Sequence, residues 1–344
     1  MATADGSPTQ LRCSVRKRSP SPAEAGEDKM NTILITVLPV FGMIVLGYGF
    51  AKTNIIDGAA SRGLGLFVFN VAIPALLFKT MATLNSADAA PWSLWAVYYG
   101  GIACTWLAAA MTSRFIPSLN YSGGATSSMA ASFGNLAMLG TPLALAHFGQ
   151  SVAVPLGLIL SIHAPILWFS ATLHREMAWH SGNFSIQKTS RELIINLAQN
   201  AIVMALIAGS LWRFTGLGLH PIVDKMLSML ADASIPTALF ALGCSLSAYS
   251  LRGSGSGMFA LIGLKMIFMP IVVFVLSHYV FVLAPLWSKI AVLFAAMPSG
   301  ANAFLFAQKN DEGVPAISGA IALGTGLAAI TASVLLYLMD SGVI

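Results

Sequence analysis

The stretch Ile73-Pro74-Ala75-Leu76-Leu77-Phe78 returns later in the chain as Ile235-Pro236-Thr237-Ala238-Leu239-Phe240, with four of the six positions identical. Each copy lies inside an apolar segment long enough to cross a membrane. Each also carries a proline, which removes a backbone donor and disturbs a regular helix. Paired segments interrupted by proline in corresponding halves of a chain are typical of secondary transporters. The pattern therefore predicts an internal repeat.

The composition is that of a polytopic membrane protein. Of the 344 residues, 56% are hydrophobic and only 9% are charged, whereas soluble domains carry about a quarter charged residues. The net charge of +5 does not indicate nucleic acid, because the basic residues are scattered in short loops. The three cysteines, Cys13, Cys104 and Cys244, are widely spaced and form no disulfide framework or zinc motif. We expect no metal and no cofactor.

Ten apolar segments are each near the roughly 20 residues that a membrane-spanning helix needs. The first five are 32–51, 61–82, 92–115, 124–148 and 152–173, and the second five are 197–216, 222–247, 257–282, 287–308 and 314–338. Because five is odd, the two halves enter the membrane from opposite sides. The sequence therefore predicts an all-α membrane protein with ten transmembrane helices in two inverted five-helix repeats.

The predicted organisation has four parts. Residues 1–29 are polar and rich in Ser and Pro, and we expect them to form a disordered N-terminal extension. The alternative is that this extension is not part of the native protein and that the chain starts at Met30. The two repeats cover residues 30–173 and 197–344. Between them, residues 174–196 form the longest polar stretch and are interpreted as a linker.

Loop charge gives an expected orientation, because cytoplasmic loops hold the excess of Lys and Arg. If both ends of the ten-span bundle lie outside, the cytoplasmic side collects the larger set of basic residues and contains the 174–196 linker. That set is Lys52, Arg62, Arg114, Arg175, Lys188, Arg191, Arg252 and Lys309, against Lys79, Arg213, Lys225 and Lys289 outside. The basic N-terminal extension points the other way unless the chain starts at Met30.

The fourth and ninth segments are predicted to be broken helices. Residues 132–142 read SFGNLAMLGTP and residues 296–304 read AMPSGANAF, so both place Pro, Gly and Asn at mid-membrane depth. Irregular backbone at that depth is tolerated where it lines a cavity or is packed in protein. The ends of half-helices can then bind an anion or a cation. These two segments therefore form the outline of a substrate site.

With these segments in view, the chain resembles the auxin efflux carrier family of membrane transporters, including its bacterial malonate-permease-like members. The resemblance covers residues 30–344, and four motifs carry it together. They are residues 70–74 (NVAIP), Gly134-Asn135 with Gly140-Thr141-Pro142, residues 235–243 from Ile235-Pro236 to Leu242-Gly243, and residues 298–304 (PSGANAF).

The resemblance implies a fixed scaffold of the first, second, sixth and seventh helices and a mobile transport domain built from the rest. It also implies that the fourth and ninth helices cross at their proline breaks beside the substrate. The crossover residues carried over by this resemblance are Asn135, Gly140, Pro142, Pro298, Ser299 and Asn302.

Two further candidates come from polar side chains inside apolar segments. Lys265 lies in the eighth segment and suits an anionic substrate, although its long stem could also reach the membrane interface. Asn70 is a candidate contact in the second segment. Like Asn135 and Asn302, it could instead bond a neighbouring helix. His163 is read as a structural residue. No Asp or Glu lies deep in any segment, and Asp232 is the nearest. The auxin-transporting relatives use an intramembrane acidic residue in coupling, so the chain departs from the family pattern here, and the resemblance implies neither carboxylate-based coupling nor auxin as the substrate.

The favoured function is a multi-pass cell-membrane transporter of small organic anions, such as malonate or other carboxylates. A coupling ion, proton or sodium, and a homodimer are compatible with it. An anion channel and a ligand-binding membrane sensor stay open as alternatives. A membrane-embedded enzyme ranks lower, because the sequence contains no constellation of nucleophile and base or of metal ligands.

Overall fold

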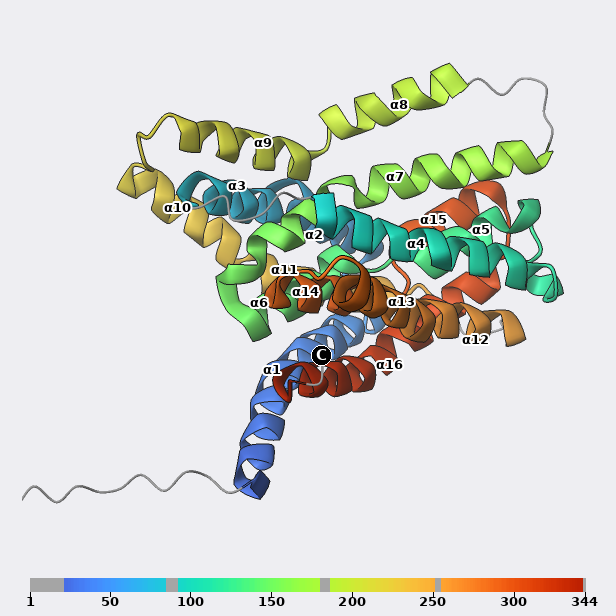
Figure 1. Ribbon diagram of the computed structural model, residues 1–344, viewed down its shortest axis with the longest axis horizontal. Helices are drawn as coiled ribbons and strands as arrows, with labels where there is room; N and C mark the ends of the chain where they lie inside the picture. The colour runs from blue at the N-terminus through green and yellow to red at the C-terminus, as the bar shows by residue number, and fades with distance from the viewer. Residues whose placement is uncertain (1–21, 85–91, 180–185, 251–254, 343–344) are drawn as a thin grey trace, which may run out of the picture.

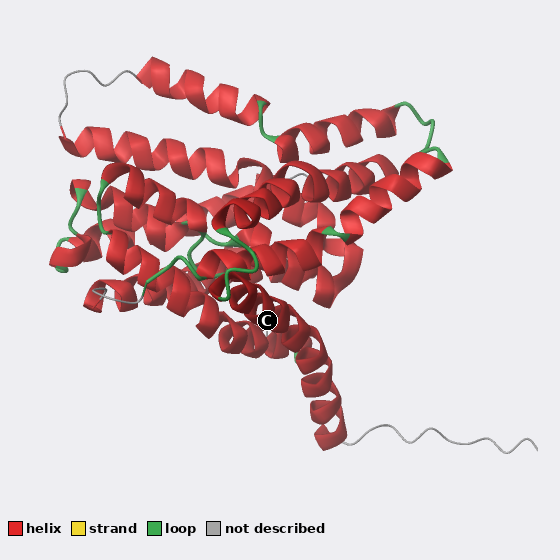
Figure 2. Ribbon diagram, turned by 180° about the vertical axis from the view of Figure 1, so that it is seen from behind, coloured by secondary structure: helices red, strands yellow, loops and turns green. Residues whose placement is uncertain are grey.

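The computed structural model describes residues 22–84, 92–179, 186–250 and 255–342. Within these ranges the chain is a bundle of helices joined by short loops (Figures 1 and 2). The single β-type contact there is an isolated antiparallel bridge between Gly134 and Ser299. The prediction of an all-α membrane protein is confirmed.

The α-helices of the first half and of the segment that follows it are α1 (Pro22–Lys52), α2 (Gly58–Phe67), α3 (Ile73–Thr83), α4 (Trp92–Ser113), α5 (Ala125–Ser132), α6 (Thr141–Phe148), α7 (Ala153–Trp179) and α8 (Ile186–Ala198). Those of the second half are α9 (Ala201–Phe214), α10 (Pro221–Asp232), α11 (Ser234–Leu246), α12 (Gly255–Gly263), α13 (Met269–Val275), α14 (Pro285–Ala295), α15 (Ala301–Asn310) and α16 (Val314–Asp340). Several of these helices continue one another through single π-helical turns.

Seven helices among the described residues are long and apolar enough to span a membrane, or eight if the pair α8 and α9, bent by 58°, counts as one span. The expected count was ten. The difference arises where the expected spans are divided. The expected fourth span is divided into α5 and α6, and the expected ninth span is divided into α14 and α15. The second part of the fourth span is counted together with the fifth span as one apolar run of 43 residues, from Leu136 to Ala178.

The two polar regions are more helical than expected. Residues 1–21 of the predicted extension lie outside the described residues, but residues 22–29 belong to α1 (Figure 1). Their sequence, PAEAGEDK, places proline at the first helical position and acidic residues in the first turns, which favours helix. In the predicted linker, α7 continues to Trp179 and α8 begins at Ile186, because residues 186–198 have an amphipathic pattern. Residues 180–185 lie outside the described residues.

The proline of the first Ile-Pro segment does not end the membrane span, which runs from Gly58 to Thr83. Pro74 follows the π-helical turn η1 (Val68–Ala72), and α3 continues from it. The same arrangement recurs at Pro142 after η4 (Leu136–Gly140) and at Pro270 after η6 (Leu264–Phe268). A wider turn accommodates a residue that lacks an N–H and crowds the preceding carbonyl. Pro236 lies in the first turn of α11, after the break at Ala233.

Two helix pairs form the most extensive contacts of the bundle: α1 lies along α11, and α3 lies along α9. Glycines allow both approaches. A Cβ added to Gly47 would lie 2.1 Å from the carbonyl oxygen of Phe240, and one added to Gly209 would lie 2.6 Å from that of Phe78. Gly209 follows Gly47 by the same number of residues as Phe240 follows Phe78. Corresponding residues of the two halves therefore make corresponding contacts.

Candidate functional site

The helices α5 and α14 both end inside the bundle, at short extended segments. After α5 ends at Ser132, Phe133 adopts an extended conformation before η4 and α6 continue the chain. After α14 ends at Ala295, the chain is not part of a helix until α15 begins at Ala301. Both segments are almost fully buried. Buried backbone groups need partners, and each segment supplies those of the other.

Three hydrogen bonds join the two breaks. The N–H of Asn135 donates to the carbonyl oxygen of Pro298 (2.8 Å), and the N–H of Gly300 donates to that of Phe133 (2.9 Å). The hydroxyl of Ser299 donates to the carbonyl of Ala130 in the last turns of α5 (2.8 Å). The free backbone groups of two distant segments are thus satisfied by pairing, as in a minimal two-stranded sheet.

Glycine is required where the two segments meet. A Cβ added to Gly300 would lie 3.0 Å from the carbonyl oxygen of Gly134 and 3.0 Å from the ring of Phe133. Any side chain there would push the paired backbones apart. Gly140 is similarly enclosed, because its Cβ would lie 3.1 Å from Met297 and 3.2 Å from Phe294.

A cavity of about 500 Å³ lies directly beside the paired breaks. Its wall is mostly apolar, with contributions from α2, α7, α9, α11 and α15 as well as the two breaks. The polar and glycine residues that line it are Ser61, Arg62, Gly65, Gly134, Asn135, His163, Asn200, Ser245, Gly300 and Asn302. Ligand sites typically have about this volume and this mixture of apolar wall and few polar groups.

Two of the predicted site residues, Asn135 and Asn302, line the cavity. Asn135 is buried, and its side-chain amide makes no hydrogen bond to the described residues. The side-chain oxygen of Asn302 accepts a long hydrogen bond from the indole N–H of Trp168 (3.4 Å), which leaves its NH₂ group free. Both amides therefore have donors available to a molecule in the cavity.

Four other predicted residues lie at or near the paired breaks and do not line the cavity. Pro298 and Ser299 make the hydrogen bonds that join the breaks. Gly140 and Pro142 are buried where η4 passes into α6. They hold the shape of the site, and the structure brings none of the four to the cavity surface.

Lys265 lies next to the paired breaks but does not line the cavity. Its side chain is fully buried, so it does not reach the membrane interface. The ammonium donates to the carbonyl oxygen of Ala295 (2.5 Å), the last residue of α14, and lies 3.3 Å from the position that a Cβ of Gly134 would occupy. A cation at a helix C-terminus offsets the partial negative charge of the unpaired carbonyls. Lys265 thus supports both breaks from behind.

Asn70 lies outside the cavity. It is exposed in η1, and its amide donates to the carbonyl of Leu66 one turn earlier in the same helix (3.0 Å). By contrast, Arg62 and His163 do line the cavity, although neither belonged to the predicted site. Arg62 was counted only as a loop charge, because it stands near the start of a span. Nothing in the sequence indicates which neighbours His163 has.

The N-termini of two half-helices also border the cavity. The chain enters η4 and α6 at Leu136 and enters α15 at Ala301, and both residues line the cavity. The first N–H groups of a helix have no partner within it and carry partial positive charge. Helix N-termini are therefore suited to bind anions.

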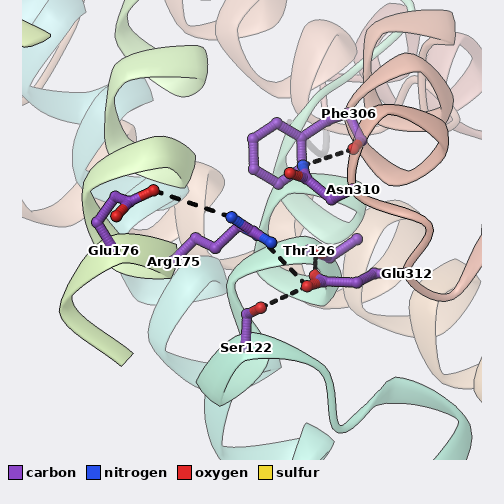
Figure 3. Close-up of polar contacts among 7 residues, drawn as sticks. All are labelled: Ser122, Thr126, Arg175, Glu176, Phe306, Asn310 and Glu312. Atoms are coloured by element: carbon purple, nitrogen blue, oxygen red, sulfur yellow. Dashed lines mark hydrogen bonds and ion pairs between the residues drawn. The ribbon is translucent and has the colours of Figure 1, made fainter. Parts of the chain in front are cut away.

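A second polar cluster lies between α5, α7 and the loop from α15 to α16, where Figure 3 shows three side chains converging on Glu312. The hydroxyls of Ser122 and Thr126 each donate to its carboxylate (2.5 Å), and the Nε of Arg175 approaches it at 3.3 Å. Glu312 is buried, so its negative charge is stabilised by these three side chains and not by water. The cluster ties the two broken regions together at a second place.

A family model described as "membrane transport protein" matches residues 32–336, nearly the whole chain. The chain belongs to the auxin efflux carrier family of membrane transporters. The resemblance seen in the sequence motifs is confirmed. This family member is accordingly a multi-pass protein of the cell membrane and a transporter, not an enzyme.

The chain is similar to three relatives with different names. A candidate malonate transporter of Rhizobium meliloti is 26% identical over 89% of this chain and 95% of its own length. The lysosomal cholesterol signaling protein of Mus musculus is 25% identical over 61% of this chain and 25% of its own length. Auxin efflux carrier component 8 of Arabidopsis thaliana is 28% identical over 44% of this chain and 42% of its own.

Proposed function

We propose that this carrier moves small organic anions, malonate-like or other carboxylates, across the membrane by alternating access. The observation that carries the proposal is the cavity at the paired breaks, where Asn135 and Asn302 present free amide donors. Substrate sites of secondary transporters form where helices are discontinuous, because the ends of half-helices leave polar groups available. The relative from Rhizobium meliloti, named for malonate and similar along nearly its whole length, supports the same substrate class.

The charge of the cavity wall favours an anion. Arg62 lines the cavity and makes no ion pair with a described residue, while no Asp or Glu is among the described lining residues. The N-termini of η4 and α15 add partial positive charge to the cavity wall, next to Asn135 and Asn302 in the chain. A carboxylate bound there would accept hydrogen bonds from the amides and from backbone N–H groups.

The architecture that we propose is ten helices in two inverted five-helix repeats, with the broken fourth and ninth helices crossing at their paired segments. The symmetric pairs support it: α1 packs on α11 as α9 packs on α3, through corresponding glycines. A two-fold axis in the membrane plane would relate the contact between α1 and α11 to the contact between α9 and α3. The first, second, sixth and seventh helices would then be the scaffold, and the broken helices would move against it.

The described conformation is proposed to be open to the cytoplasm. The exposed Arg62 near the start of α2, Asn200 before α9 and Ser245 near the end of α11 all border the cavity. These helix ends lie on the side that loop charge assigns to the cytoplasm. Alternating access would close this side and open the other around the same crossing.

The position of each side chain indicates its proposed role. Asn135, Asn302 and Arg62 contact the substrate. Gly140, Pro142, Pro298 and Ser299 shape the crossing, and Lys265 positions it by holding the end of α14. Asn70, which bonds its own helix away from the cavity, has no role in binding.

Counterflow in proteoliposomes tests the function. Vesicles containing the purified carrier and loaded with unlabelled malonate should transiently concentrate external labelled malonate, and a panel of other carboxylates should compete. Choline serves as the cation control. Absence of counterflow for every carboxylate, or preference for the cation, would reject the proposal.

A ligand-binding sensor is the second candidate, and the similarity to the lysosomal cholesterol signaling protein is the observation that favours it. A sensor would bind ligand without flux. An anion channel would conduct but would show no transient accumulation of label. The same vesicle experiment therefore separates all three functions.

A further inference from the structure

His163 is a buried side chain whose polar atoms have no partner among the described residues. It lies in α7, is 3% exposed and lines the cavity beside the paired breaks. Neither ring nitrogen makes a hydrogen bond to a described residue. Buried polar groups are almost always bonded, because leaving one unpaired is costly. Both nitrogens are buried in the described conformation, so a partner from the cavity reaches them only when the surrounding side chains move.

The imidazole is held in place by packing. Its ring lies 4.7 Å from that of Phe133, in the break after α5, and 5.9 Å from that of Tyr98 in α4. The carbonyl of Phe133 accepts one of the hydrogen bonds that join the breaks. A change in the charge of His163 would therefore act directly beside the crossing.

The titratable groups around His163 are two tyrosines and two cations. Tyr98 faces it from α4, and its hydroxyl has no partner among the described residues. Tyr99 packs on Tyr98, and its hydroxyl donates to the carbonyl of Ile159 (2.8 Å). Lys265 acts on it electrostatically from η6, and Arg62 lines the same cavity. No carboxylate is among the described residues that line this cavity. An imidazolium there would lack a negative partner until an anion enters.

We propose that His163 binds the proton that accompanies the substrate anion, which makes it the coupling group of the carrier. This inference rests on the proposed anion transport and adds the coupling ion to it. A carboxylate in the cavity stabilises the imidazolium, and by reciprocity the imidazolium strengthens carboxylate binding. One proton from the aqueous phase adds to a ring nitrogen with the anion and leaves on the other side with it.

The proposal explains how coupling can occur without an intramembrane acid. Proton-coupled carriers commonly use Asp, Glu or His chains inside the membrane. Among the described residues that line the cavity, His163 is the side chain that can gain and lose a proton, because the guanidinium of Arg62 stays protonated under all ordinary conditions.

The test uses the full-length carrier in proteoliposomes with the membrane potential clamped by potassium and valinomycin. We expect an acidic outside to stimulate malonate uptake by the wild type severalfold over uptake at equal pH. His163→Gln keeps a polar side chain but cannot carry the proton, so counterflow should persist while stimulation by the pH gradient is lost. His278→Gln changes an exposed histidine of another membrane segment, stacked on Phe274, and should behave as wild type.

A second measurement covers the case in which His163→Gln is poorly folded. Weakly buffered wild-type protein in detergent should take up about one proton per bound malonate, as reported by a pH dye, and His163→Asn should take up none. Wild-type counterflow without any response to the pH gradient, or an unchanged response in His163→Gln, would overturn the coupling proposal while leaving anion transport intact. Absence of wild-type counterflow would overturn both.

Discussion

The N–H of Asn135 donates to the carbonyl oxygen of Pro298, so the residue whose side-chain amide lines the cavity is fixed through its backbone by the opposite break. The two segments are far apart in the sequence, and each lacks helical partners of its own. Their pairing satisfies buried backbone groups and places Asn135 and Asn302 at the surface of one cavity. A substrate that binds both amides would therefore sense the position of both broken helices.

Gly47 permits the close approach of α1 and α11. Gly47→Ala should destabilise the protein by about 1 to 3 kcal/mol, because its methyl group would overlap the carbonyl of Phe240. Gly42→Ala in the same helix is the matched control, since nothing lies within 4 Å of its added Cβ. Thermal unfolding in detergent makes the comparison. Equal midpoints for the two variants would contradict the tight contact.

Lys265 is predicted to support the crossing. Lys265→Met keeps most of the apolar stem but leaves the carbonyl of Ala295 unpaired, at a cost of about 1 to 3 kcal/mol. We expect a lower unfolding temperature together with reduced transport. Lys225→Met, at an exposed position of α10, should change neither. Loss of transport at unchanged stability would instead indicate that the charge of Lys265 contacts the substrate.

The Glu312 cluster is predicted to stabilise the broken region. Glu312→Gln removes the charge that Arg175 and two hydroxyls contact, so stability should fall by roughly 2 to 4 kcal/mol. The neighbouring Asp311→Asn is the control, because Asp311 is exposed and Asn tolerates its left-handed backbone. Limited proteolysis and thermal unfolding report the difference. If both variants unfold alike, the cluster contributes little.

Arg62 is predicted to bind the anion at the open side of the cavity. Arg62→Gln should weaken malonate affinity by roughly 1.5 to 3 kcal/mol, which is about tenfold or more in KM, with little change in stability. Arg191→Gln, at an exposed position of α8, removes the same charge far along the chain and should leave KM unchanged. Equal KM shifts in both variants would reveal a general electrostatic effect rather than a contact.

The sequence could indicate where the backbone becomes irregular, because Pro, Gly and Asn have strong local effects that do not depend on tertiary context. It could not distinguish side chains that face the cavity from those behind it. Pro298 and Asn302 are four residues apart, yet the first joins the breaks and the second lines the cavity. Lys265 was expected to face either the substrate or the interface, whereas its partner is a carbonyl 30 residues later in the chain.

The residues that sequence reasoning missed were hidden by their position in the chain. Arg62 stands near the start of a span, where a basic residue usually reports topology only. Glu312 lies between two spans, so its burial was not visible in the hydropathy pattern. His163 looks like any histidine that bonds a neighbouring helix, and only the three-dimensional packing leaves its nitrogens without a partner.

Malonate binding by three asparagine variants tests the central claim most directly, which is that the paired breaks form the substrate site. The measurement is equilibrium binding of labelled malonate to purified protein, normalised to folded material. Asn135→Ala and Asn302→Ala should each weaken binding by about 1 to 3 kcal/mol, or 5- to 150-fold, because each removes a donor to the carboxylate. Asn70→Ala, which removes an amide bonded only within its own helix, should bind as wild type does. Wild-type affinity in both cavity variants, or a loss as large in Asn70→Ala, would contradict the account.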